Sequence, residues 1–142
     1  MSANIPHEVV KTYNLGRARI EFWDNGITYL AFVPETEVDI ELARAVFTIM
    51  KQNQQQGERP LILIDMGKYT TLSKEARELS YSPEGLGLTR ISAIVVHSLA
   101  QRLMINLMAD LKASHSIKVK AFRTPGDARE WLLRQKAKRR NK

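Results

Sequence analysis

The 142-residue sequence contains no cysteine and only three histidines. The lack of cysteine excludes disulfide bonds, a cysteine nucleophile and thiolate metal ligands. His7, His97 and His115 show no metal-binding spacing, and no glycine motif for phosphate occurs. His97 and Ser98 pair a base with a nucleophile, but neighbours on a strand point to opposite faces. We therefore predict a protein that is not an enzyme, with no catalytic residue, cofactor or metal site.

Long hydrophobic runs are also missing. The most apolar stretch, residues 91–100, is shorter than the roughly 18 residues that a membrane span requires. Residues 1–8 lack the basic start and apolar core of a signal peptide. Hydrophobic residues make up 44% and charged residues 26% of the chain, which is typical of a globular protein. We expect one soluble, cytoplasmic domain over residues 1–142, with a loose N-terminal segment at 1–15.

Positive charge is concentrated at the C-terminus. The net charge is +7, and residues 129–142 hold seven lysines and arginines against one glutamate. Such a basic tail could attract nucleic acid or an anionic membrane surface. We favour a solvated helix end instead, because no aromatic side chain is interleaved with the last eight residues to stack on bases. The tail, residues 134–142, contains Arg134, Lys136, Lys138, Arg139, Arg140 and Lys142.

An alternating apolar pattern near the N-terminus predicts a β-hairpin, with strands at 17–23 and 27–33. Asn25-Gly26 suits a two-residue turn, since both residues tolerate a positive φ. A loop of that length would place Phe22 opposite Tyr29. Leu30 and Phe32 would then lie on the other face of the hairpin, where they could be exposed.

Alternating β and α segments follow the hairpin. We predict strands at 61–65, 91–96 and 117–122, and helices at 39–56, 73–79, 99–112 and from 124 onward. Asp39, Ser73, Ser98 and Thr124 are the expected N-caps, and Gly57 follows the first helix. The predicted fold is α/β: a β-hairpin followed by alternating β/α units, with a mixed, mostly parallel five-stranded sheet and four helices.

Several of these segments resemble the STAS superfamily, in particular the small stand-alone SpoIIAA-like domains of bacteria, which are like anti-sigma-factor antagonists. The resemblance covers residues 17–133. It is carried by the hairpin, by LILIDMG at 61–67 leading to a short helix, and by FRT at 122–124 with AREWL at 128–132. It implies a non-catalytic regulatory domain that binds a protein partner or a small ligand. The superfamily is also structurally similar to CRAL-TRIO lipid-transfer domains, which suggests a carrier of apolar or lipid-like molecules as an alternative.

One departure from the family pattern concerns its phosphorylatable serine. Asp65 matches the aspartate at the strand end and Ser73 matches the helix cap, but Lys74 and Glu75 fall where the phosphoserine would be. Ser73 could still accept a phosphate, yet serine is a leading N-cap residue. We therefore expect Ser73 to cap the helix, and we do not expect a phosphorylation switch.

Two surfaces are candidates for binding. The first is the carboxyl edge of the parallel strands, where open α/β sheets hold their ligands and where we expect 65–72, 80–90 and 97–98 to meet. The second is the helix at 99–112, whose methionines and leucines spread over more than one stripe and could serve a homodimer or a lipid-like ligand. The candidate residues are Asp65, Lys68, Ser73, Lys74, Glu75, Arg90, Ser98 and, on that helix, Asn106.

Overall fold

A computed structural model describes residues 7–54 and 61–140 of the chain. Its main sheet has six strands in the order β1 (Val9–Asn14), β2 (Ala18–Trp23), β3 (Ile27–Phe32), β5 (Leu61–Asp65), β7 (Ile91–Val95) and β8 (Lys118–Phe122). The helices are α1 (Ile40–Asn53), α2 (Lys74–Tyr81), α3 (Pro83–Leu88), α4 (Leu99–Ala113) and α5 (Pro125–Arg140). Two short strands, β4 (Glu37–Val38) and β6 (Thr71–Leu72), pair in parallel and join the loops that precede α1 and α2.

The predicted α/β class is confirmed. β1, β2 and β3 are antiparallel neighbours, whereas β3, β5, β7 and β8 run parallel. To the predicted five strands and four helices the described residues add β1 as a sixth strand of the main sheet, the short strands β4 and β6, and a fifth helix. β1 lies within the segment that we expected to be loose, so that expectation is wrong for residues 9–14, while residues 1–6 lie outside the described part. α3 arises because Ser82 ends α2 and also caps a new helix that starts at Pro83.

The predicted register of the hairpin is wrong by one residue. Phe22 pairs with Thr28, not with Tyr29. The loop has three residues because Asp24 joins the turn: Gly26, at φ +88°, donates its backbone N–H to the carbonyl of Trp23 at 3.2 Å. A one-residue shift moves every side chain of the second strand to the other face. Leu30 and Phe32 are therefore buried in the core and not exposed.

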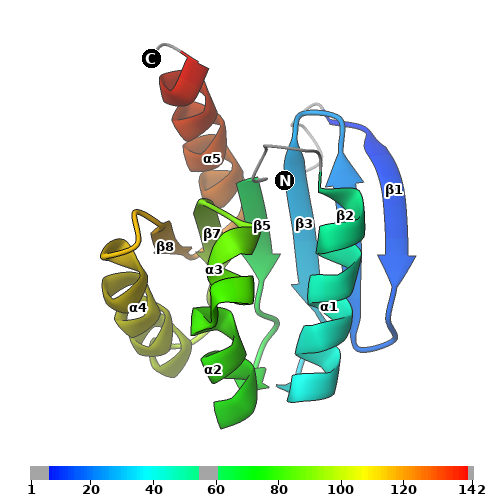
Figure 1. The fold of residues 1–142 in the computed structure, drawn as a ribbon, viewed down its shortest axis with the longest axis vertical. Coiled ribbons are helices and arrows are strands. Elements are labelled where there is room, and N and C mark those ends of the chain that lie inside the picture. Colours follow the sequence, from blue (N-terminus) through cyan, green and yellow to red (C-terminus); the bar gives the residue numbers. More distant parts are fainter. Residues whose placement is uncertain (1–6, 55–60, 141–142) are drawn as a thin grey trace.

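The sheet is covered on both faces. Helices α1 to α4 lie on one side of it and α5 on the other (Figure 1). Ile62 of β5 packs in the cluster formed with α1, whereas Leu63, the next residue, packs against Leu132 of α5. Because both faces of β5 and β7 are covered, both strands are apolar along most of their length.

The basic C-terminal segment is part of α5 as far as Arg140, which agrees with the interpretation of this segment as a helix end. Lys136 donates to the backbone carbonyl of Asn25 at 2.6 Å, which ties the helix to the hairpin turn. Arg134 pairs with Glu130 at 3.0 Å. Lys142 and the side chains of Arg139 and Arg140 lie outside the described part of the structure.

The turn after β5 depends on a glycine. Gly67 has a φ of +78°, and a Cβ atom there would lie 2.6 Å from the backbone oxygen of Phe32. Gly87 of α3 offers a comparison, because a Cβ atom added to it would meet nothing within 4 Å.

We expect Gly67→Ala to lower the free energy of unfolding by about 2 kcal/mol or more, since it combines backbone strain with a clash against main-chain atoms. Gly87→Ala should leave stability unchanged or raise it by up to about 1 kcal/mol, as alanine is the better helix former. Urea denaturation of both variants checks this. Equal effects of the two substitutions would contradict the role assigned to Gly67.

Candidate functional site

The loops at the carboxyl ends of β5 and β7 come together, as predicted for 65–72 and 97–98. Asp65 and His97 are joined by a 2.7 Å contact between Oδ1 and Nε2. Asp65 also accepts the backbone N–H of Gly67 at 3.0 Å. The carboxylate of Asp65 therefore stabilises the turn after β5 and contacts the loop that follows β7.

Gln101 fastens these loops together. Its side chain is buried, and its amide nitrogen donates to the carbonyls of Gly67 and Thr70, both at 2.9 Å. Its amide oxygen accepts the backbone N–H of His97 at 2.7 Å. Sequence reasoning missed Gln101, although its spacing from the buried residues Ile105 and Met108 places it on the inward side of α4.

Two predicted site residues act as helix caps. Ser73 accepts the backbone N–H of Ala76 and Ser98 accepts that of Gln101, each at 3.1 Å. The capping interpretation of both serines is confirmed. Lys74 and Glu75, in the first turn of α2, are exposed, as are Lys68 in the loop after β5 and Asn106 on α4.

Arg90 does not belong to this edge of the sheet, so its predicted place is wrong. It directly precedes β7, and its carbonyl accepts the backbone N–H of Lys118 at 2.9 Å. Ile91 pairs with Leu61, which is the first residue of β5. A parallel strand must restart at the edge where its neighbour began. The chain after Ser82 therefore runs back along α3 to the opposite end of the sheet from Asp65.

A cavity of about 130 Å³ lies between the sheet and helices α1, α3 and α4. Its walls are almost wholly apolar and include Leu30, Ile62 and Ile94 from the sheet. Val46 and Met108 approach from α1 and α4. An engineered apolar cavity of roughly 150 Å³ stays dry and binds benzene, so a space of this size can hold a ring or a short acyl chain.

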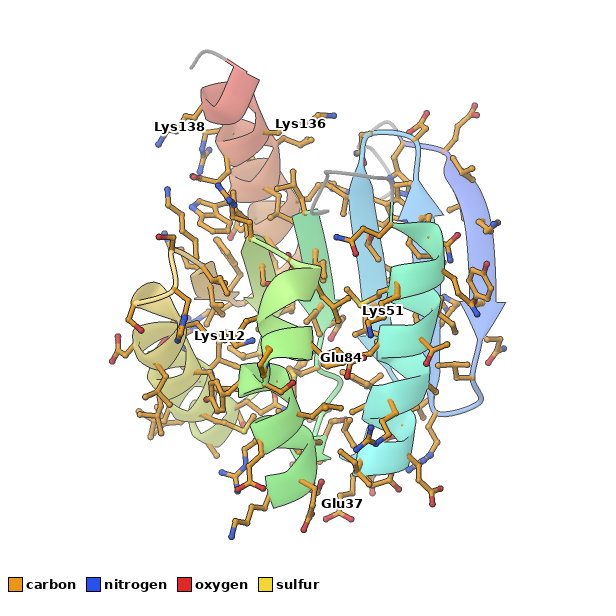
Figure 2. The ribbon with its side chains drawn as sticks, in the orientation of Figure 1. Glu37, Lys51, Glu84, Lys112, Lys136 and Lys138 are labelled. Atoms are coloured by element: carbon orange, nitrogen blue, oxygen red, sulfur yellow. The ribbon has the colours of Figure 1, made fainter. Side chains whose placement is uncertain are left out.

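Lys112 stands at the wall of this cavity, where α4 faces α3 (Figure 2). Burial lowers the pKa of its ammonium group below the ordinary value of 10.5. The group lies 5.8 Å from the centre of the Tyr81 ring and forms no ion pair within residues 7–54 and 61–140. It is the one basic residue among those that line the cavity in the described part. Lys112 follows Ile105 by seven residues and Met108 by four, so the sequence alone could have placed it on the same face of the helix as these two residues.

An ion pair between Lys51 and Glu84 joins α1 to α3, and Figure 2 shows the two side chains pointing toward one another. Lys51 follows Met50 and Glu84 precedes Gly85, and both of these neighbours line the cavity. The pair therefore lies at the rim of the cavity and links the two helices on either side of it.

No group of three or more histidine, aspartate or glutamate side chains that could hold a metal ion is found within the described ranges. A search of the same residues for a helix long and apolar enough to cross a membrane finds none.

The described residues thus define an α/β fold in which a mixed sheet is covered by four helices on one face and one on the other, with an apolar cavity under the larger layer. The chain belongs to the family described as "Domain of unknown function (DUF7793)", whose family model matches residues 21–136. That range extends from β2 into α5 and includes every residue of the cavity wall. Neither the curated proteins nor the solved structures contain a match to the chain.

We expect Gln101→Met to lower the free energy of unfolding by about 3 kcal/mol, because it leaves three backbone groups of two loops without their partner. Gln52→Met, at an exposed position of α1, is the matched control and should change stability by less than about 0.5 kcal/mol. Urea denaturation measures both, and hydrogen exchange should quicken at Thr70 and His97. An effect no larger than that of the control would show that Gln101 does not fasten the loops.

Lys112→Met should stabilise the fold at pH 7, since the native state no longer holds a desolvated charge. The pKa of Lys112 is lower in the folded than in the unfolded chain, so the unfolded chain binds more protons between the two values. Wild-type stability therefore rises with pH in that window, and the gain from the substitution should shrink as the pH approaches 10.5. Denaturation at a series of pH values tests this, with exposed Lys74→Met as control; a gain that is independent of pH would contradict it.

Proposed function

We propose that this chain is a non-catalytic binding domain that holds a small, mainly apolar carboxylate in the cavity between the sheet and helices α1, α3 and α4. The observation that carries this proposal is the placement of Lys112, a partly buried cation, at the wall of an almost wholly apolar space. Apolar pockets with a few convergent polar groups are the usual form of small-molecule sites.

The chemistry of the ligand follows from the two parts of the site. The apolar wall favours a hydrocarbon body, and about 130 Å³ limits it to a ring or a short chain. The ammonium of Lys112 has lost part of its hydration and has gained no acidic partner among the described residues. A carboxylate would supply the opposite charge in a place where water screens it poorly, so the ion pair would be stronger there than at the surface.

This function is of the small-ligand kind that the STAS resemblance implies, and it is close to the alternative of an apolar-ligand carrier. The resemblance itself, a regulatory role and a cytoplasmic location stay predictions. The phosphorylation-switched variant of the STAS function has less support, because the hydroxyl of Ser73 caps α2. Attachment to nucleic acid or membranes through α5 also has less support, as Lys136 and Arg134 already have partners.

The test is a titration of the purified protein with hexanoate and phenylacetate, followed by calorimetry and by NMR shifts of the residues around the cavity. Hexanoate should bind, whereas acetate, which lacks an apolar body, should not. Hexanol should bind about tenfold or more weakly than hexanoate, because it lacks the charge that pairs with Lys112.

Three variants make the test specific. Lys112→Met should bind hexanoate no better than hexanol, and Lys74→Met should behave as the wild type. Ala43→Leu, which extends a wall residue into the cavity, should abolish binding of both compounds. Hexanoate binding that survives both Lys112→Met and Ala43→Leu, or no binding of any of these compounds to the wild type, would refute the proposal.

A further inference from the structure

The outer face of α4 carries an exposed row of leucines. Leu99, Leu103, Leu107 and Leu111 are spaced four residues apart and are 71%, 60%, 61% and 51% exposed, respectively. The inward side of the same helix holds the buried residues Gln101, Ile105 and Met108. α4 packs on β8, the edge strand of the sheet, and stands at the margin of the helix layer (Figure 1). The leucines therefore face away from the rest of the molecule.

A second row lies beside the leucines. Arg102, Asn106 and Asp110 are also four residues apart, and residues three apart on a helix are neighbours, so this row flanks the first. It has a cation at one end, an amide in the middle and an anion at the other. Neither Arg102 nor Asp110 takes part in an ion pair within the described part of the chain.

Each row has the same kinds of side chain in either direction along the helix, except that the second row has the cation Arg102 at one end and the anion Asp110 at the other. We propose that α4 pairs with α4 of a second copy of this chain in an antiparallel, two-fold symmetric arrangement. Leu103 of each copy then meets Leu107 of the other, and Leu99 meets Leu111. In a two-fold antiparallel pair each flank faces the same flank of the other copy. Arg102 therefore lies opposite Asp110 in both directions, with the two Asn106 amides between them.

The charge pattern favours this occupant over others. A parallel pairing would set Arg102 against Arg102 and Asp110 against Asp110. A membrane surface is disfavoured, because helices that lie on membranes carry lysine and arginine on their polar face, whereas the exposed face here carries Asp110 and Asn106. Two helices of 15 residues bury less than the roughly 1,200–2,000 Å² of a stable interface. We therefore expect a dimer that dissociates in the micromolar range.

Charge reversal provides the test, read by sedimentation velocity of the full chain over a concentration series from about 10 µM to about 500 µM. The wild type should shift from monomer to dimer across the series. Arg102→Glu and Asp110→Arg should each be monomeric, because each sets like charges opposite one another on both sides of the two-fold axis. An equimolar mixture of the two variants should dimerise again, because the introduced glutamate then meets the introduced arginine, and Asp110 of one copy meets Arg102 of the other. Arg44→Glu, an exposed reversal on α1, is the control and should dimerise as the wild type does.

The outcomes separate cleanly. A monomeric wild type at every concentration, single variants that dimerise as well as the wild type, or a mixture that stays monomeric would each overturn the proposal. Leu103→Ser together with Leu107→Ser should also abolish the dimer, and circular dichroism shows whether the variants stay folded. Co-sedimentation of the wild type with neutral or anionic vesicles, lost in the leucine variant, would assign the face to a membrane instead. None of these results depends on the ligand cavity.

Discussion

The burial of β5 and β7 on both faces is the constraint on which the rest of the structure depends. Leu63 faces α5, while Ile62 faces the layer of helices α1 to α4. Both helix layers must therefore be present for β5 and β7 to be buried on both faces. Parallel neighbours also require helical crossovers, which bring each strand back to the edge where the previous one began. This return places Asp65 and His97 at one end of the sheet and Arg90 at the other.

The same constraint explains where the cavity forms. The layer above β5 and β7 is closed between α1 and α4 by α3, a helix of six residues that contains two glycines. Gly85 lies so close to the end of α2 that a Cβ atom would be 2.5 Å from the carbonyl of Leu79, so no side chain can project there. The space that α3 leaves unfilled is lined by Gly85 and Leu88 and bounded by Lys112. The cavity thus borders on the tight α2–α3 junction.

Much of this fold can be predicted from local signals. Asp39 accepts the N–H of Leu42, and Thr124 that of Asp127, because capping depends on a few neighbouring residues. The buried strands are also evident as apolar runs. The hairpin register is not evident from the sequence, because Asn25-Gly26 fits a loop of two residues as well as one of three. Burial of Leu30 and Phe32 in the core selects the three-residue loop. β1 has no buried residue and pairs through its backbone, so no apolar pattern marks it.

The candidate site was harder to predict, because α4 has two apolar rows. Ile105 and Met108 form one row and the leucines the other, and both match the periodicity of an amphipathic helix. The leucine row has four large apolar side chains, yet it faces outward, while Gln101 and Lys112 face inward. The reason lies in contacts distant in sequence: the loop carbonyls need the amide of Gln101. Composition alone could not identify which row is buried.

Taken together, the two proposals assign the two sides of α4 to different tasks. Gln101 anchors the N-terminal half of the helix, whereas Lys112 at the other end carries a charge that the fold leaves uncompensated among the described residues. A carboxylate in the cavity would hold that end through Lys112, and Asp110 and Leu111 lie in the same turn. Any ordering of this turn by the ligand would favour the pairing of two copies, and by thermodynamic linkage pairing would raise ligand affinity by the same factor. A ligand that leaves this turn unchanged would leave the pairing unchanged, because only a difference in affinity between states can shift an equilibrium.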